Sequence, residues 1–364
     1  MWIILSAIVV VIAGIALFIH QPQFGRTPKN ERQERIKSSP NYRDGKFQNL
    51  SVTPQLTSDK GFIGSLIDFV FKKKEGLKPE KAIPSVKTDL HQITVKEDIL
   101  VWFGHGSYFI QIEGKRILVD PVFSKAASPV SFVNKAFEGT NIYSAVDIPD
   151  IDYLIISHDH WDHLDYPTVM ELKPRIRKVI CGLGVGEHFE RWGFDQKDIV
   201  EMDWNEEAIL DSGFEIFCLP TRHFSGRSIS PNQSLWASYL LKTPESKIYI
   251  GGDGGYDTHF SAIGKRFGDI DLAILENGQY DMGWKYIHML PDETLKAGKD
   301  LRAKNVLPVH NSKFALGNHA WDEPLRKVSE LHDKADFSLW TPMIGQKVNI
   351  KDSVQVFSRW WEGL

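Results

Sequence analysis

The run HDHWDH at residues 158–163 constrains this chain more than any other feature of its sequence. It follows the continuous apolar segment 153–157, which is typical of a buried β-strand. Three imidazoles and two carboxylates within six residues are costly to bring together unless a cation compensates them. Imidazole and carboxylate groups are ligands of zinc, and also of iron and manganese. The run therefore predicts a metal site at the end of a strand, rather than a histidine-rich surface turn.

Residues of the same chemistry follow three other predicted strands. His223, Asp253 and His310 each stand a few residues beyond an apolar segment that is typical of a strand. A single histidine at a strand end is more often structural, but this repetition within one chain makes coincidence improbable. We expect Asp253 to bridge two ions, because a carboxylate has two oxygens. The predicted ligands are His158, His160 and His223 for the first ion, and Asp162, His163 and His310 for the second.

These residues lie in motifs by which the chain resembles the metallo-β-lactamase superfamily, and within it the N-acylphosphatidylethanolamine-hydrolysing phospholipase D family and its bacterial relatives. The motifs are WFGHG at 102–106, LVDPVFS at 118–124, SHDHWDHLDY at 157–166, GDGGY at 252–256, GKRFG at 264–268 and HNSKFAL at 310–316. The resemblance covers roughly residues 99–345. It implies an αββα sandwich with the metals at one edge, between the sheets. All seven metal ligands of the family pattern are present.

Two ions define an expected mechanism. Divalent ions about 3.5–4 Å apart, zinc being our expectation and iron or manganese alternatives, lower the pKa of a bridging water toward neutrality. We expect the metal-bridging hydroxide to attack the phosphorus of a phospholipid phosphodiester, with Asp162 orienting it and His288 assisting the leaving alkoxide. The resemblance also places a substrate-side histidine at His288. Asp120 resembles the family's structural aspartate, and His105, in a Gly-His-Gly turn, is expected to support the site rather than to bind metal.

The substrate is less constrained than the metal site. Gly254 stands where the family pattern has threonine, and Glu276 stands where relatives are apolar. The same hydroxide could attack the carbonyl of a lactone or another ester, so a lactonase is the main alternative to a phospholipase D. A non-catalytic, metal-bound membrane scaffold predicts a broken ligand set, which is not what the chain has. The net charge of −4 gives no reason to expect a nucleic-acid partner, and the sequence gives no prediction of oligomeric state.

The N-terminus carries a candidate membrane anchor. Residues 2–19 contain no charge, and at about 1.5 Å per residue a helix of this length approaches the thickness of a bilayer core. A cleaved signal peptide fits less well, because no Lys or Arg precedes the run and residues 18–21 are a poor cleavage site. The basic residues that follow are Arg26, Lys29, Arg32, Arg35 and Lys37. By the positive-inside rule they place the catalytic domain in the cytoplasm.

The chain is therefore expected to divide into four segments. These are a transmembrane anchor at 1–20, a tether at 21–97, a catalytic domain at 98–350 and a C-terminal tail at 351–364. The tether includes a short apolar helix at 61–71, which is followed by three lysines and suits either packing on the domain or contact with a membrane surface. The two cysteines, Cys181 and Cys218, lie in apolar runs, which excludes a disulfide framework.

Overall fold

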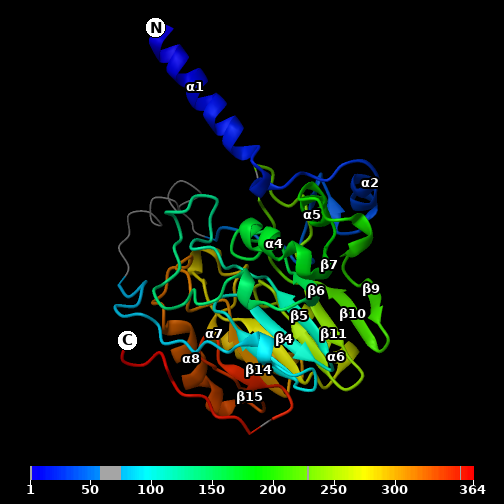
Figure 1. The fold of residues 1–364 in the computed structure, drawn as a ribbon, viewed down its shortest axis with the longest axis vertical. Helices are drawn as coiled ribbons and strands as arrows, with labels where there is room; N and C mark the ends of the chain where they lie inside the picture. The colour runs from blue at the N-terminus through cyan, green and yellow to red at the C-terminus, as the bar shows by residue number, and fades with distance from the viewer. Residues whose placement is uncertain (1, 58–74, 228, 353) are drawn as a thin grey trace.

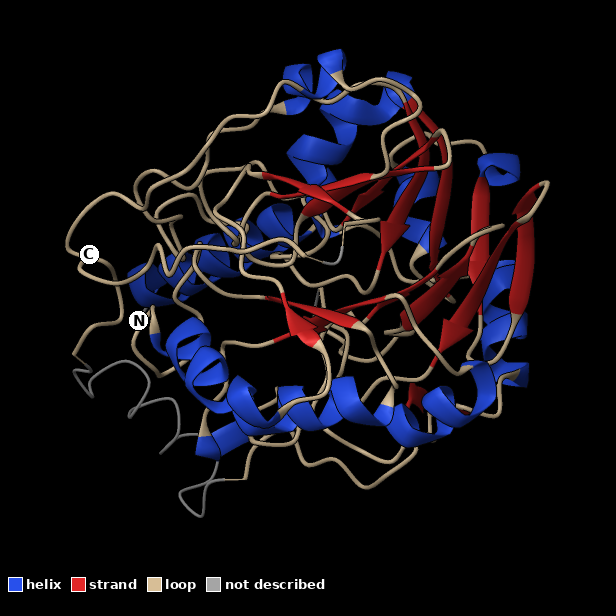
Figure 2. Ribbon diagram, turned by 90° about the horizontal axis from the view of Figure 1, so that it is seen from below, coloured by secondary structure: helices blue, strands red, loops and turns tan. Residues whose placement is uncertain are grey.

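The computed structural model describes residues 2–57, 75–227, 229–352 and 354–364. Two seven-stranded sheets lie face to face, and helices cover their outer faces (Figures 1 and 2). The predicted αββα sandwich is thus confirmed. The helices are α1 Trp2–Ile19, α2 Asn30–Ser38, α4 Tyr166–Leu172, α5 Gly186–Arg191, α6 His259–Phe267, α7 Pro291–Asp300 and α8 Glu323–Leu331.

The first sheet has the strand order β16-β3-β4-β5-β6-β7-β8. Its strands are β3 Ile99–Trp102, β4 Tyr108–Ile112, β5 Lys115–Val119, β6 Ile151–Ile156, β7 Ile176–Gly182, β8 Ile199–Met202 and β16 Lys347–Asn349. A tight hairpin joins β4 to β5, with Ile112 opposite Lys115 and positive φ angles at Glu113 (47°) and Gly114 (76°). Two consecutive positive φ values are characteristic of the tightest β-hairpins. From β5 to β8 the strands are parallel.

The second sheet has the order β15-β14-β13-β12-β11-β10-β9. Its strands are β9 Glu207–Asp211, β10 Phe214–Leu219, β11 Ser238–Lys242, β12 Lys247–Ile250, β13 Leu272–Glu276, β14 Asn305–Val309 and β15 Ser338–Leu339. Strands β12 to β15 are parallel, so the carboxyl ends of β12, β13 and β14 meet at one edge. This edge is where the sequence predicted ligands.

Three apolar layers hold the sandwich together. The central layer lies between the sheets, where Trp102, Tyr153 and Tyr239 are almost completely buried. Outside the first sheet, α4 and α5 pack against the strands, and outside the second sheet α6 and α7 do the same. Burial on both faces explains why these strands are continuous apolar runs rather than alternating ones.

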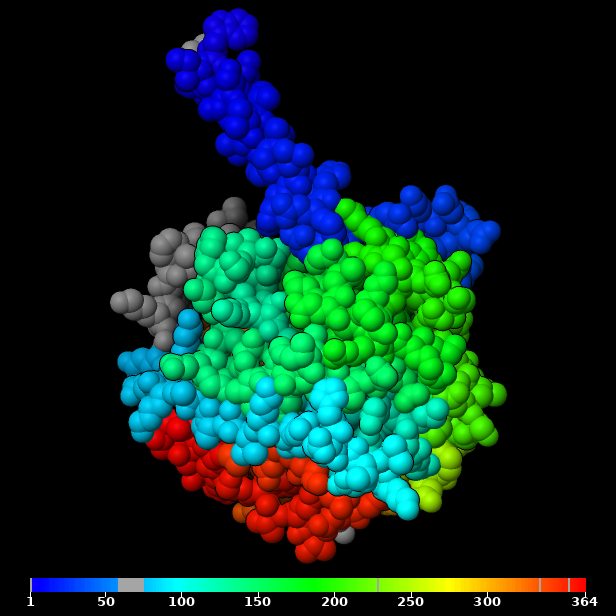
Figure 3. All heavy atoms as spheres, viewed as in Figure 1, coloured from blue at the N-terminus to red at the C-terminus, as the bar shows by residue number. Residues whose placement is uncertain are grey.

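Helix α1 stands clear of the body and none of its residues is buried (Figure 3). It is long and apolar enough to cross a membrane. The part of the predicted tether that follows it is packed more closely than expected. Residues 22–57 form the turn η1 Pro22–Phe24, helix α2 and the small hairpin β1 Tyr42–Arg43 and β2 Lys46–Phe47. Ile36 and Phe47 are fully buried and join the central layer.

An ion-pair network, besides these apolar contacts, fixes the segment. Arg32 of α2 lies 2.6 Å from Glu187, 2.6 Å from Glu190 and 2.7 Å from Glu201. The predicted helix at 61–71 and its three lysines lie outside the described residues. The C-terminal tail also packs on the body, since Trp360 and Trp361 are buried.

We expect Arg32→Ala to lower the free energy of unfolding by about 3 kcal/mol, because it leaves the buried carboxylate of Glu201 without its ion-pair partner and removes one of the two partners of Glu187. Denaturant unfolding of the full chain would measure the change. Arg35→Ala on the same helix is the matched control, since Arg35 and Glu206 are 45% and 46% exposed and such pairs contribute at most about 1 kcal/mol. Equal effects of the two substitutions would contradict this assignment.

Candidate metal centre

Loops at one edge of the sandwich build the candidate metal centre. The HDHWDH run follows β6 of the first sheet, and residues beyond β10, β12 and β14 of the second sheet face it. His310, directly after β14, has a φ of 65°, and Gly252, after β12, has a φ of 58°. At Gly252 a side chain would also collide with Ser157, because its Cβ would lie 2.7 Å from the Ser157 Cβ. The close approach of these two loops therefore requires glycine.

The first predicted ligand set converges on one point. Nδ1 of His160 lies 2.8 Å from Nε2 of His158 and 3.3 Å from Nε2 of His223. The ligand atoms of all three lie within 4.8 Å of one another. A tetrahedral zinc with Zn–N bonds of about 2.0–2.1 Å separates its ligand atoms by roughly 3.3 Å. These three nitrogens can therefore hold one ion.

The second predicted set gathers around Asp162. Its Oδ2 lies 3.3 Å from Nε2 of His310 and 3.5 Å from Nε2 of His163. His105 comes closer still, with Nε2 at 2.9 Å from the same oxygen. The sequence predicted a supporting position for His105, and the structure puts it beside Asp162, where it can either orient that carboxylate or join the ligand group.

Asp253 lies between the two sets. Its Oδ2 is 3.9 Å from Nε2 of His158 and 3.7 Å from Nε2 of His223. On the other side the same oxygen is 3.2 Å from Nε2 of His163 and 3.1 Å from Nε2 of His310. One carboxylate therefore reaches both groups, which is the position that a bridging ligand requires.

The electrostatics of the cluster suit divalent cations. Burial, reinforced by the neighbouring imidazoles, lowers the pKa of His158 well below its usual value, so the ring is neutral and keeps a lone pair for a metal. Burial likewise lowers the pKa of His310 to about 3. Burial alone would raise the pKa of Asp253, but the surrounding histidines outweigh it and hold the pKa well below the usual range. Burial would lower the pKa of His163, but Asp253, Asp162 and Asp120 outweigh it and raise that pKa well above its usual value, so this ring must lose a proton when it binds a metal.

Asp120 supports the cluster from behind. Its Oδ2 lies 2.8 Å from Nδ1 of His163 and accepts a hydrogen bond of 2.5 Å from Oγ of Ser157. Its Oδ1 accepts from the backbone N–H of Ser157 at 2.8 Å. The contact with Nδ1 leaves Nε2 of His163 directed at Asp253. Such a carboxylate–histidine pair fixes the tautomer and orientation of a metal-binding imidazole.

His288 lies in the site beside Glu276, whose role the sequence did not predict. Glu276, at the end of β13, is 1% exposed, and its Oε2 lies 2.7 Å from Nδ1 of His288. Its Oε1 accepts a hydrogen bond of 2.6 Å from the N–H of Met289. Burial raises the pKa of Glu276 to about 7, and Glu276 in turn raises the pKa of His288 against the effect of burial. Glu276 also stands at the end of a strand, as the predicted ligands do, so the same sequence pattern could have identified it.

A cavity of about 330 Å³ opens over the cluster. Its walls are largely apolar, and its polar base contains ligands of both predicted sets together with His288. The apolar lining residues are Leu56, Phe224, Trp284, Ile287 and Leu316. An apolar pocket with a few convergent polar groups is the usual form of a small-molecule site.

Comparison with known proteins defines the class. Residues 115–311 match the family model described as the β-lactamase superfamily domain. The chain also resembles the solved structure of Igni18, a metallo hydrolase of Ignicoccus hospitalis, with 20% identity and a TM-score of 0.52 over 70% of this chain and 98% of that one. The chain therefore belongs to the metallo-β-lactamase superfamily and is a metal-dependent hydrolase by class.

Two relatives narrow the family. The chain is 30% identical over 279 residues to N-acyl-phosphatidylethanolamine-hydrolyzing phospholipase D 1 of Caenorhabditis elegans, covering 71% of this chain and 78% of the relative. It is 35% identical over 329 residues to Rv0906 of Mycobacterium tuberculosis, covering 89% and 88%. The family resemblance predicted from the motifs is thus confirmed.

We expect Asp120→Asn to weaken metal binding about 10- to 100-fold, because His163 loses the carboxylate that orients it. Competition with a chromophoric chelator would measure the affinity, and circular dichroism would verify the fold. Asp195→Asn is the control, since that side chain is 69% exposed and its ion pair is with Lys197, which is not a residue of the site. Unchanged affinity in the folded Asp120 variant would refute the supporting role.

Proposed function

We propose that this chain is a binuclear metal-dependent phosphodiesterase of phospholipase D type, acting on N-acylphosphatidylethanolamine-like phospholipids. The observation that carries the proposal is the buried carboxylate of Asp253 within 3.9 Å of four imidazoles, at the base of an apolar cavity. The homology to a phospholipase D that hydrolyses N-acylphosphatidylethanolamine gives the substrate class.

The donor set fits two divalent cations. His158, His160 and His223 would hold one ion, Asp162, His163 and His310 the other, and Asp253 both. When bound, two such ions acidify a water molecule and neutralise phosphodiester oxygens. Zinc is the expected metal, since nitrogen-rich sites of this kind favour it, although iron and manganese accept the same ligands.

The chain's own residues move the protons. Asp162 faces the cavity and can orient the attacking water through its second oxygen. His288 also lines the cavity, with Nδ1 held by Glu276, so its Nε2 is free to donate a proton to the leaving alkoxide oxygen as the P–O bond breaks. A positioned general acid of this kind contributes about 10²- to 10⁴-fold in rate.

The cavity walls suit a lipid. Leu56, Phe224 and Leu316 offer apolar surface to acyl chains, and Trp284 offers a large ring at the same opening. Trp161, by contrast, does not line this cavity but packs against Phe24. We further propose that α1 is retained as a membrane anchor, with the catalytic domain on the cytoplasmic side.

We expect His160→Ala and Asp253→Ala each to reduce hydrolysis of N-acylphosphatidylethanolamine by roughly 10³-fold or more, because each removes a metal ligand. Mass spectrometry of the phosphatidic acid and N-acylethanolamine released from vesicles would measure the rate. His91→Ala, an exposed histidine bonded to the carbonyl of Val146, is the control. Lactone substrates are assayed in parallel: turnover of lactones without phospholipid hydrolysis would reject the phosphodiesterase in favour of a lactonase.

We expect Glu276→Gln to lower kcat about 10- to 100-fold with little change in KM, because His288 loses its charged partner and part of its acid function. Steady-state kinetics over a range of pH, with metal content measured on the same samples, separates this effect from metal loss. Glu330→Gln, at a side chain that is 52% exposed and paired with Arg326 on the surface, is the matched control. A Glu276→Gln enzyme with unchanged kcat would refute the role of Glu276.

A further inference from the structure

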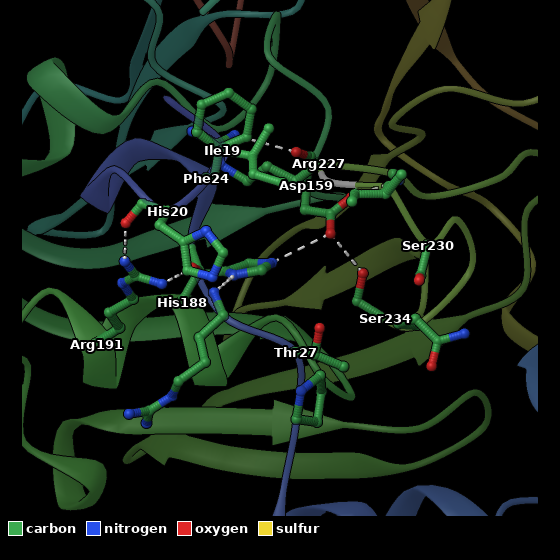
Figure 4. A pocket seen from close by; sticks show the side chains of 16 residues that line it. Ile19, His20, Phe24, Thr27, Asp159, His188, Arg191, Arg227, Ser230 and Ser234 are labelled. Atoms are coloured by element: carbon green, nitrogen blue, oxygen red, sulfur yellow. Dashed lines mark hydrogen bonds and ion pairs between the residues drawn. The ribbon is translucent and has the colours of Figure 1, made fainter. Parts of the chain in front are cut away.

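A second cavity lies at the foot of α1, separate from the one over the metal centre. It has a volume of about 410 Å³ and is formed by the end of α1, the following turn, α5 and the loop residues 226–227 and 229–234 (Figure 4). Three arginines line it, Arg26, Arg191 and Arg227. Arg26 forms an ion pair with Glu187, so the argument rests on the other two. None of the residues lining it is a predicted metal ligand, so the cavity has no part in the mechanism above.

Arg227 is a buried cation without a carboxylate partner among the described residues. It is 3% exposed, its Nε donates to the carbonyl of Gln23 at 2.6 Å, and its Nη1 donates to the carbonyl of Asp159 at 3.1 Å. Its Nη2 is buried and has no hydrogen-bond partner. The guanidinium lies 4.1 Å from the ring centre of Trp161. Burial lowers its pKa to about 10, so it remains charged at neutral pH.

Arg191 adds a second positive charge. Its Nη2 donates to the carbonyl of His20 at 2.6 Å and its Nη1 to the carbonyl of Gly25, and no described carboxylate pairs with it. The one carboxylate in the cavity, Asp159, is engaged by Ser234 at 2.7 Å and by His188 at 3.2 Å. The cavity therefore holds more positive than negative charge, which favours an anion. Guanidinium groups match phosphate oxygens in geometry and charge.

The position of the cavity identifies the source of that anion. Helix α1 is an uncharged helix of 18 residues, none of them buried, and it ends at Ile19, which lines the cavity. If α1 spans a bilayer, its end lies at the level of the phospholipid headgroups. We propose that this cavity binds the headgroup phosphate of an anionic phospholipid. The proposal rests on the membrane anchoring proposed above, but not on catalysis.

The same contacts connect the cavity to the metal centre. Asp159 stands between the predicted ligands His158 and His160 in the chain, and its backbone carbonyl accepts the bond from Arg227. Phe24, just after α1, packs edge-on against Trp161 of the same run at 5.1 Å. A lipid bound at Arg227 would therefore contact a side chain that is itself hydrogen-bonded to the metal-binding run.

The test uses the full chain in dodecyl maltoside micelles, titrated with dioctanoylphosphatidylglycerol and followed by tryptophan fluorescence, since Trp161 and Trp192 flank Arg227. We expect saturable binding at least tenfold tighter than that of the neutral dioctanoylphosphatidylcholine. Arg191→Gln should weaken the binding of phosphatidylglycerol about tenfold or more, because hydrogen bonds to charged groups are strong. Arg359→Gln, at an exposed arginine of the C-terminal tail, should leave the binding unchanged.

Arg191→Gln is the main variant because Arg191 is only half-buried, and Arg227→Gln is the second. Equal binding of the two lipids, or wild-type affinity in the folded Arg191 variant, would overturn the proposal. Glycerol 3-phosphate is titrated alone as well: binding as tight as that of the lipid would assign the cavity to a soluble phosphate and reject the lipid. Hydrolysis is not measured here, so failure of this site and failure of the phosphodiesterase are separate results.

Discussion

The carboxylate of Asp253 is the point on which the rest of the structure depends. It is 2% exposed and lies within 3.9 Å of four imidazole nitrogens. Two of these rings follow β6 of the first sheet, and the other two follow β10 and β14 of the second sheet. Burying this many ionisable groups is costly unless cations compensate them. The two sheets help to offset that cost, because each group stands beyond the end of a strand that the packed core holds in place. Asp120, behind His163, then restricts one of the two rings that lie closest to the carboxylate.

The segment that follows α1 is in contact with this centre. Phe24 and Arg227 both contact Trp161, which lies inside the metal-binding run. Arg32 ties the segment after α1 to the first sheet's periphery through three glutamates. Phe18 of α1 packs on Phe24, which packs on Trp161, so the end of α1 is connected to the metal-binding run through one aromatic ring. In an anchored protein this arrangement would hold the cavity over the metals in a fixed relation to the bilayer.

The sequence predicted the features that depend on local patterns of residues. Apolar runs gave most strands, and residues at their ends gave the groups that the structure brings together, because parallel strands end at a common edge. It did not predict the packing of residues 22–57, since Arg32 meets Glu187 across 155 positions of chain. Nor did it predict the pairing of Glu276 with His288, or the unpaired Arg227. Such pairings depend on which distant segments of the chain come together. The residue type at one position does not reveal which residue it will contact.

The central claim is that the buried imidazoles and carboxylates form a site for two ions. Elemental analysis of the full chain, purified without chelators, dialysed against metal-free buffer and quantified by amino-acid analysis, tests this claim most directly. We expect two divalent metal ions per chain, with zinc the expected element. A folded and active chain that holds one ion or none would contradict it.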